Sequence, residues 1–275
     1  MKYSATAPVK IIVLGAGGTG GYLIPHLYRI AFSDENRNYR IIICDGDIVE
    51  RKNLIRQNFI EQDIGRNKAS VLAERYAGAF GIECEYIPEY IESEQRLKEL
   101  VRSDFTKSPW TNAKETQRVI LIGCVDNNKS RAICHKVFYE TKDLVYIDSG
   151  NGEHTGQVVC GIRQNGRTTF KPVGTLYPDI LKAEDKLPTE LSCAERAVSA
   201  PQSVTANLTA ATAVTSFLYD LLVTGDLTTR YVTFSSKIIS TRAETVKKRK
   251  RRTEKWHCLK ATKEESTRSI PSCLS

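Results

Sequence analysis

Near its N-terminus the chain reads KIIVLGAGGTG, from Lys10 to Gly20. Residues 10–14 form an unbroken, β-branched apolar run, which indicates a buried parallel strand. Apolar residues then recur at helical spacing from 18 to 32. A strand, a glycine-rich turn and a helix in this order leave free N–H groups at the start of the helix, and such groups bind phosphate. We therefore expect a nucleotide to bind at Gly15, Gly17, Gly18 and Gly20.

The rest of the chain alternates between predicted strands and helices. Further strands are predicted at 39–44, 82–87, 118–123, 145–148, 157–162 and 230–239, and further helices at 66–80, 92–101, 129–140 and 203–222. This alternation predicts an α/β protein with a Rossmann-like, mostly parallel, doubly wound sheet and late antiparallel strands. We expect one domain over 1–245, with a surface insertion at about 102–117, a crossing loop at about 163–192 and a basic tail at 246–275.

The composition is that of an ordinary globular chain: 275 residues, 41% hydrophobic and 26% charged. No run of about 18 apolar residues predicts a membrane span, and the first ten residues do not resemble a signal peptide. We therefore expect a cytoplasmic protein with no membrane partner. The eight cysteines include no CxxC pair, which argues against a structural zinc site, and those at 44, 124, 134 and 160 are expected to be packing residues.

An acidic residue follows the second predicted strand at Asp45, about where nucleotide-binding folds place the ligand of the ribose. Two cations, Arg56 and Lys68, come soon afterwards. A triphosphate carries more charge than the diphosphate linkage of a dinucleotide, and Arg can grip it with two hydrogen bonds while Lys acts as a point charge. Each cation alone is equally consistent with a solvated surface position. Together, beside a glycine loop, they favour ATP.

Several of these motifs together resemble the ThiF/MoeB superfamily, the adenylyltransferases similar to ubiquitin-activating enzymes. The shared residues are the GxGGxG loop, Asp45-x-Asp47, Asn53-Leu54-x-Arg56-Gln57, Gly65-x-x-Lys68, and Cys124-Val125-Asp126-Asn127 followed by Arg131. The resemblance covers roughly 9–141 and continues more weakly through 193–222. Among relatives, the chain looks most like the small stand-alone ThiF-type proteins of bacterial plasmids, such as those of the PRTRC gene cluster.

The resemblance implies an enzyme that binds ATP and Mg²⁺ and adenylates the C-terminal carboxylate of a ubiquitin-like or sulfur-carrier protein. By position, Asp45 and Asp47 would lie at the ribose side of the nucleotide. The residues Asn53, Arg56, Gln57 and Lys68 would contact the triphosphate and the attacking carboxylate. Asp126 would bind Mg²⁺, with Asn127 beside it. A carboxylate at the end of the fourth strand is a natural Mg²⁺ ligand, and Asn127 is available to cap the next helix instead.

A cysteine at position 193 precedes the long apolar helix, in the pattern of those family members that transfer the acyl group to a thiol. Cys193 is equally consistent with a covalent nucleophile and with an ordinary thiol, because thiolate character depends on surroundings that sequence does not give.

Two family features are missing. The two zinc-binding CxxC pairs of many relatives are absent, so we expect no zinc. Only about ten residues precede the first strand and none is Arg, so an arginine reaching across a homodimer would have to come from elsewhere, for example Arg51. A homodimer is still what the resemblance implies.

The last 30 residues carry ten Lys or Arg and three Glu, with six consecutive cations at 247–252. Such a run attracts polyanions, nucleic acid among them, and is also typical of a solvated tail. A second substrate for adenylation also stays open, a carboxylate on a peptide or on modified tRNA, and the basic run would suit RNA. Two lower alternatives are an NAD-dependent oxidoreductase and a binding module that has lost its chemistry.

Overall fold

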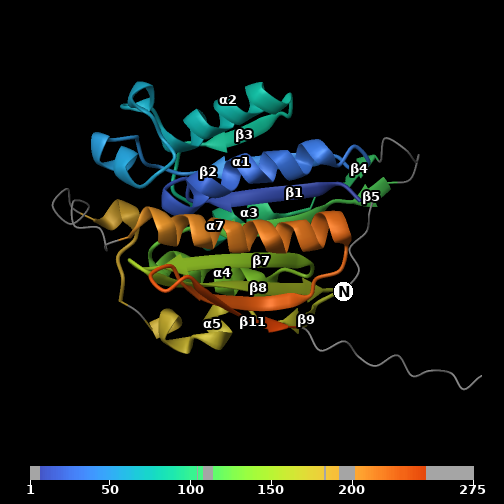
Figure 1. Ribbon diagram of the computed structural model, residues 1–275. Helices are drawn as coiled ribbons and strands as arrows, with labels where there is room; N and C mark the ends of the chain where they lie inside the picture. The colour runs from blue at the N-terminus through green and yellow to red at the C-terminus, as the bar shows by residue number, and fades with distance from the viewer. Residues whose placement is uncertain (1–6, 104, 108–113, 183, 192–201, 246–275) are drawn as a thin grey trace, which may run out of the picture.

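The computed structural model describes residues 7–103, 105–107, 114–182, 184–191 and 202–245. Their main feature is a nine-stranded sheet in the order β11-β10-β8-β7-β6-β1-β2-β3, with β9 paired to β8 (Figure 1). The predicted α/β class is confirmed, including the change from parallel to antiparallel strands along the chain.

The parallel half of the sheet is centred on β1 (Val9–Leu14), whose six residues are all buried. It pairs with β2 (Tyr39–Cys44) on one side and β6 (Arg118–Gly123) on the other. The outer parallel strands are β3 (Cys84–Ile87) and β7 (Leu144–Asn151). The chain therefore leaves β1 for one side of the sheet and later returns to the other, which opens a crevice at the carboxyl end of β1.

The antiparallel half begins where β8 (Thr155–Gln164) turns back along β7. β10 (Thr229–Ser235) pairs with β8, and β11 (Ser240–Thr245) forms the sheet edge. β9 (Arg167–Phe170) pairs with the other end of β8.

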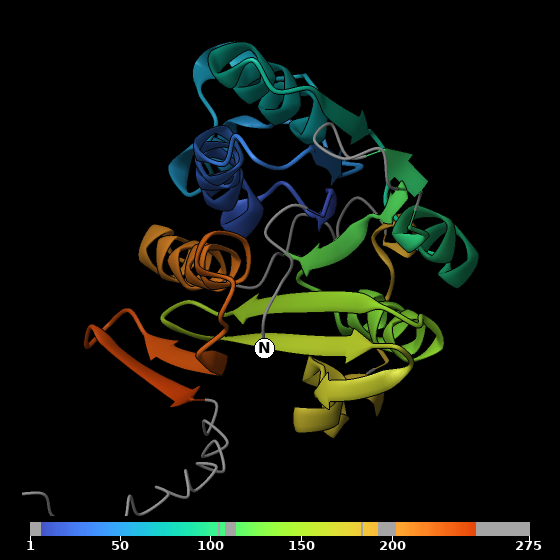
Figure 2. The same cartoon turned by 90° about the vertical axis from the view of Figure 1, so that its right-hand side faces the viewer.

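Helices cover both faces of the sheet (Figures 1 and 2). On one face α1 (Gly18–Ser33), α2 (Lys68–Phe80) and α7 (Val204–Tyr219) pack on the side chains of Ile11, Ile43 and Ile122. On the other, α3 (Glu94–Val101), α4 (Asn128–Glu140) and α5 (Val173–Leu176) pack on the alternate strand residues, such as Ile12 and Leu121. The continuous apolar runs of the strands are explained by this burial on both faces.

Short helical turns lie in the connections. They are η1 (Arg51–Ile55), η2 (Glu61–Asp63), η3 (Pro178–Lys182), η4 (Pro188–Glu190) and η5 (Asp220–Thr224). The first two lie between β2 and α2, in the segment that carries Asn53 and Arg56.

Some elements differ from the sequence-based expectations. The expected insertion at 102–117 contains a separate hairpin of β4 (Phe105–Lys107) and β5 (Lys114–Thr116). The expected crossing loop contains β9, α5, η3 and η4. The late strand ends at Ser235, and β11 follows a turn. These strands are short and polar, and their pairing partners rather than their own composition specify them.

The sequence predicts no segment that is long and apolar enough to span a membrane, but the helical stretch Val204–Thr224 is one. It has 21 residues and a mean hydropathy of 1.2, which is sufficient by length and composition alone. Half of the tested window is buried inside the protein, and Ala210, Val214 and Leu218 pack in the core. A core helix can have the same length and hydropathy, so these two properties are weak evidence for a membrane span. Its outer face, including Leu208 and Tyr219, is exposed.

Candidate active site

The glycine loop joins the carboxyl end of β1 to the first turn of α1. Gly15 has a φ of +93°, and a Cβ atom there would lie 2.5 Å from the carbonyl oxygen of Cys124. Only glycine fits both conditions, as the predicted tight turn requires. Gly17 precedes α1, and no side chain among the described residues caps this N-terminus. The first N–H groups of α1 are therefore available to an anion.

A chain of buried amides supports the loop from behind. Thr19 Oγ1 donates to Asn151 Oδ1 (3.1 Å), and Asn151 Nδ2 donates to Asn207 Oδ1 (2.9 Å). Asn207 is fully buried, and its Nδ2 donates to the carbonyl oxygen of Arg56 (3.2 Å). A Cβ atom at Gly18 would lie 2.6 Å from this amide. Gly18 is therefore required at least as much by the packing of α1 on α7 as by any ligand.

Asp45 lies at the end of β2, and its side chain fixes the glycine loop. Its carboxylate accepts hydrogen bonds from the backbone N–H groups of Ala16 (2.6 Å) and Asp47 (2.8 Å). Burial raises the pKa of Asp45 to about 6, against the opposing effects of Lys68 and these two hydrogen bonds. The predicted ribose ligand thus also connects the loop to β2.

The neighbouring Asp47 binds two donors. Lys68 Nζ lies 2.9 Å from its Oδ2, and the Tyr90 hydroxyl donates to its Oδ1. The Lys68 side chain is only 6% exposed, whereas that of Asp47 is 45% exposed, so a ligand reaches the acid more easily than the amine. The Tyr90 ring lies directly above Gly46.

The crossover after β2 places the next three predicted residues beside the loop. Asn53 is buried, and its Oδ1 accepts the N–H of Glu50 (2.8 Å), so its side chain shapes η1. Arg56 Nη1 donates to Gln202 Oε1 (2.8 Å). The Gln57 amide lies 3.5 Å from the position of a Cβ on Gly17, and its buried Oε1 has no hydrogen-bond partner among the described residues.

Asp126 lies just beyond β6, at the same carboxyl edge as the glycine loop, and it is exposed. Asn127 does what the sequence suggested and caps α4, because its Oδ1 accepts the N–H of Ser130 (2.7 Å). No group of three potential metal ligands occurs within the described part of the chain. One exposed carboxylate nevertheless fits Mg²⁺, which commonly takes one or two carboxylates and completes its shell with phosphate oxygens and water.

Behind Asp126 lies a buried ion pair. Arg131 Nε is 3.4 Å from Asp148 Oδ2, and both side chains are almost fully buried. The Tyr146 hydroxyl donates to Asp148 Oδ1 (2.8 Å). Burial raises the pKa of the Asp148 carboxyl, and the adjoining guanidinium and hydroxyl oppose that rise.

Cys124, Cys134 and Cys160 are poor nucleophiles. Burial raises the pKa of Cys124 and of Cys134 to about 12, and that of Cys160 higher still. A thiol with such a pKa is protonated at neutral pH. Cys193 lies outside the described residues, as does the basic run at 247–252. The described residues on either side of the Cys193 segment are held by ion pairs and hydrogen bonds: Glu190 to Lys129 (2.7 Å) and Gln202 to Arg56.

The structure thus brings the predicted loop, Asp45, Asp47, Arg56, Gln57 and Lys68 together, with Asp126 on the adjacent strand end. Sequence reasoning missed Tyr90, Asn151, Asn207 and Asp148. Asp148 was noticed only as the end of a strand. The others gave no signal, because an isolated Tyr or Asn is common in any loop or helix.

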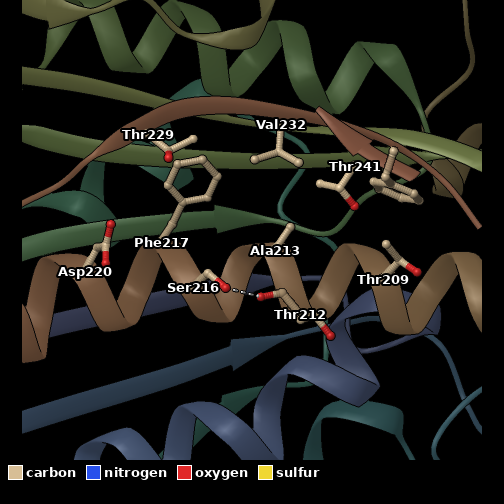
Figure 3. A pocket seen from close by; sticks show the side chains of 10 residues that line it. Thr209, Thr212, Ala213, Ser216, Phe217, Asp220, Thr229, Val232 and Thr241 are labelled. Atoms are coloured by element: carbon tan, nitrogen blue, oxygen red, sulfur yellow. Dashed lines mark hydrogen bonds between the residues drawn. The ribbon is translucent and has the colours of Figure 1, made fainter. Parts of the chain in front are cut away.

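A second hollow lies away from the glycine loop, between α7 and the β10–β11 hairpin (Figure 3). It encloses about 200 Å³ and is lined by residues such as Ala213, Phe217 and Val232. The hydroxyls of Thr209, Thr212 and Ser216 on its rim donate to carbonyl oxygens of their own helix. None of the predicted site residues lines it.

Comparison with known proteins gives a family match and a set of similar folds. The ThiF family matches residues 4–259. No curated protein matches the chain. Among solved structures, PaaA is 19% identical with a TM-score of 0.58, over 86% of this chain and 64% of that one.

Two further structures are of MccB. The complex of E. coli MccB with ATP is 16% identical with a TM-score of 0.55, over 86% of this chain and 63% of that one. The microcin C7 biosynthetic enzyme MccB with N-formylated MccA is 18% identical with a TM-score of 0.57, over 86% and 64%. The chain thus spans slightly less than two thirds of these proteins, and at such identities the likeness is one of fold.

Proposed function

The chain belongs to the ThiF family, and from that membership and its site we propose that it is an ATP-dependent adenylyltransferase acting on the carboxylate of a peptide or small protein. The observation that carries the proposal is the gathering of four features at one carboxyl edge of the sheet. These are the uncapped N-terminus of α1, the Lys68–Asp47 pair, the Arg56 guanidinium, and the exposed carboxylate of Asp126.

In the proposed reaction an oxygen of the substrate carboxylate attacks the α-phosphorus of ATP. The bond from that phosphorus to the oxygen bridging the α- and β-phosphates breaks, and pyrophosphate leaves with its electrons. The product is an acyl adenylate. An anion attacks an anion here, so positioning and charge neutralisation supply most of the catalysis.

Each residue has a task that follows from its position. The N–H groups of α1 bind phosphate oxygens, and Asp45 and Asp47 lie at the ribose side. Arg56 and Lys68 neutralise charge that develops on pyrophosphate. Gln57, whose amide lies beside Gly17, contacts the triphosphate or the attacking carboxylate. Asn53 shapes the turn that presents Arg56. Asp126, beside Asn127, would hold Mg²⁺, which supplies electrostatic stabilisation of the phosphates.

The substrate we propose is the C-terminal carboxylate of a ubiquitin-like or sulfur-carrier protein. The complex of the microcin C7 biosynthetic enzyme MccB with N-formylated MccA supports a peptide as the alternative substrate. We further propose that the Cys193 thiolate attacks the carbonyl carbon of the acyl adenylate, so that a thioester forms and AMP leaves. The residues flanking its segment support this step, because they are bonded to Lys129 and Arg56. We also propose that the chain forms a homodimer. Residues 1–245 act as one unit in this proposal, and 246–275 form a tail.

ATP–pyrophosphate exchange with candidate acceptors tests the reaction. We expect exchange that depends on a small protein with a C-terminal glycine. Exchange that depends on RNA, or on a short peptide alone, would instead assign one of the alternative substrates. Calorimetry that shows a clear preference for NAD over ATP would overturn the proposed adenylation. A thiol-sensitive conjugate that persists in Cys193→Ser would exclude Cys193 as the attachment point.

A further inference from the structure

The buried pair of Arg131 and Asp148 has no part in the proposed reaction, yet it lies directly behind Asp126. Arg131 is in the first turn of α4, and its Nη2 donates to the carbonyl oxygen of Val125 (2.6 Å), the residue before Asp126. The same nitrogen lies 3.5 Å from the carbonyl oxygen of Ser149, at the end of β7. One guanidinium therefore connects the ends of β6 and β7 and fixes the turn that presents Asp126.

This arrangement creates an electrostatic problem. Arg is charged at every physiological pH, and Arg131 is only 7% exposed, so water screens its charge poorly. Burial by itself would lower the pKa of Arg131. The nearby Asp148, Tyr146 and Asp126 outweigh burial and raise that pKa above its ordinary value, so the charge of Asp126 acts at Arg131. By reciprocity, the cation at Arg131 opposes any second cation that binds to Asp126.

Asp148 lies where it can cancel that charge. It is completely buried within β7, and its Oδ2 faces Arg131 Nε at 3.4 Å. Neither of these two atoms has a hydrogen-bond partner among the described residues. The contact between these two atoms thus acts mainly as an ion pair.

We propose that Asp148 is a positioning residue that neutralises Arg131, so that Arg131 holds the Asp126 turn without repelling a divalent cation there. The inference rests on the proposed function, because that function places Mg²⁺ at Asp126. The inference gives the two residues different roles: Arg131 holds the turn that carries the metal ligand, and Asp148 cancels the charge of Arg131.

The test measures binding rather than catalysis. Free Mn²⁺ is followed by electron paramagnetic resonance during titration of the full chain with a non-hydrolysable ATP analogue present, and analogue binding is measured separately without metal. In Asp148→Asn we expect about tenfold weaker Mn²⁺ binding, from an uncompensated charge nearby. Binding of the metal-free analogue, an anion, should be unchanged or tighter. A merely structural defect would weaken both Mn²⁺ binding and binding of the metal-free analogue.

A double-mutant cycle decides the mechanism. Arg131→Gln/Asp148→Asn removes both charges, and we expect Mn²⁺ affinity within about threefold of the wild type. Tyr146→Phe is the matched control, because it removes a hydrogen bond to Asp148 while keeping both charges, and it should leave Mn²⁺ affinity unchanged. The inference is overturned if Asp148→Asn binds Mn²⁺ normally, or if the double variant is as defective as the single one.

Breaking a buried pair can prevent folding. If Asp148→Asn does not fold, Arg131→Gln takes its place. The Gln side chain keeps an N–H donor for the Val125 carbonyl oxygen but loses the positive charge, so Mn²⁺ should bind more tightly than in the wild type, and adding Asp148→Asn should reverse that gain. No gain in Arg131→Gln would overturn the inference. A wild-type chain that binds neither the analogue nor Mn²⁺ would instead overturn the proposed function, and this inference with it.

Discussion

The parallel and antiparallel halves of the sheet contribute to the site in different ways. In the parallel half, β1, β2 and β6 end at one edge, and each strand end directly provides site residues: the glycine loop, Asp45 and Asp126. In the antiparallel half, β8, β10 and β11 alternate in direction. That half reaches the site through α7, whose Asn207 and preceding Gln202 contact Gly18 and Arg56. The parallel half supplies the charges, and α7 supplies the support that holds them in place.

The largest expected effect comes from removing a charge of the parallel half. Asp126→Ala should lower the rate of ATP–pyrophosphate exchange by about 100-fold or more, which is typical of losing one electrostatic group in such a site. Metal-free ATP binding should change little. Asp185→Ala is the matched control, because Asp185 is a nearby carboxylate whose Oδ2 accepts the N–H of Asn128, the second residue after Asp126. Equal losses in the two variants would contradict a specific role for Asp126.

The next effect concerns Asp45 and pH. Its pKa in the folded protein is about 6, against an ordinary value of 3.8, so the folded state holds this proton more tightly than the unfolded chain does. The free energy of unfolding should therefore fall as pH rises from about 4 to 6 and level off above that. The part due to Asp45 is about 3 kcal/mol.

Urea denaturation between pH 4 and pH 8 measures this effect as the difference between the wild type and Asp45→Asn. That comparison removes the contributions of the other titrating groups. A difference that does not vary with pH would show that the Asp45 pKa is not raised.

A smaller effect tests the support from α7. Gly18→Ala places a methyl group against the buried Asn207 amide and should lower the free energy of unfolding by roughly 1–3 kcal/mol. Gly17→Ala meets only an ordinary contact with Gln57 at 3.5 Å and should cost much less. Thermal unfolding of both variants gives the comparison. If the order is reversed, the requirement for glycine at 18 does not come from α7.

The smallest effect concerns the single contact of Gln202 with Arg56. Gln202→Ala removes one partly buried hydrogen bond and should lower the free energy of unfolding by about 1 kcal/mol or less. Gln202→Glu retains an acceptor and should be neutral or slightly stabilising. A loss in the alanine variant as large as that in Gly18→Ala would mean that Gln202 does more than support Arg56.

The sequence predicts the parallel half well and the antiparallel half less well. Residues 10–14 correspond to β1, and 39–44 and 118–123 match β2 and β6, because buried strands carry their own apolar signal. β9 and β11 were missed, since short polar strands are specified by their neighbours. The same holds within the site: residues in motifs were found, whereas the contacts of Asn207 and Asp148 depend on strands and helices far apart in the chain.

The pairing of β1 has a consequence for the order in which the chain folds. Its two neighbours are β2, which follows closely, and β6, which begins more than a hundred residues later at Arg118. The contact of Asn207 with the backbone of Arg56 spans 151 positions. During synthesis the glycine loop therefore emerges early but is completed late, when α7 has left the ribosome. Until β6 has emerged, the nascent chain exposes the unpaired, largely apolar edge of β1, which is the kind of surface that chaperones bind.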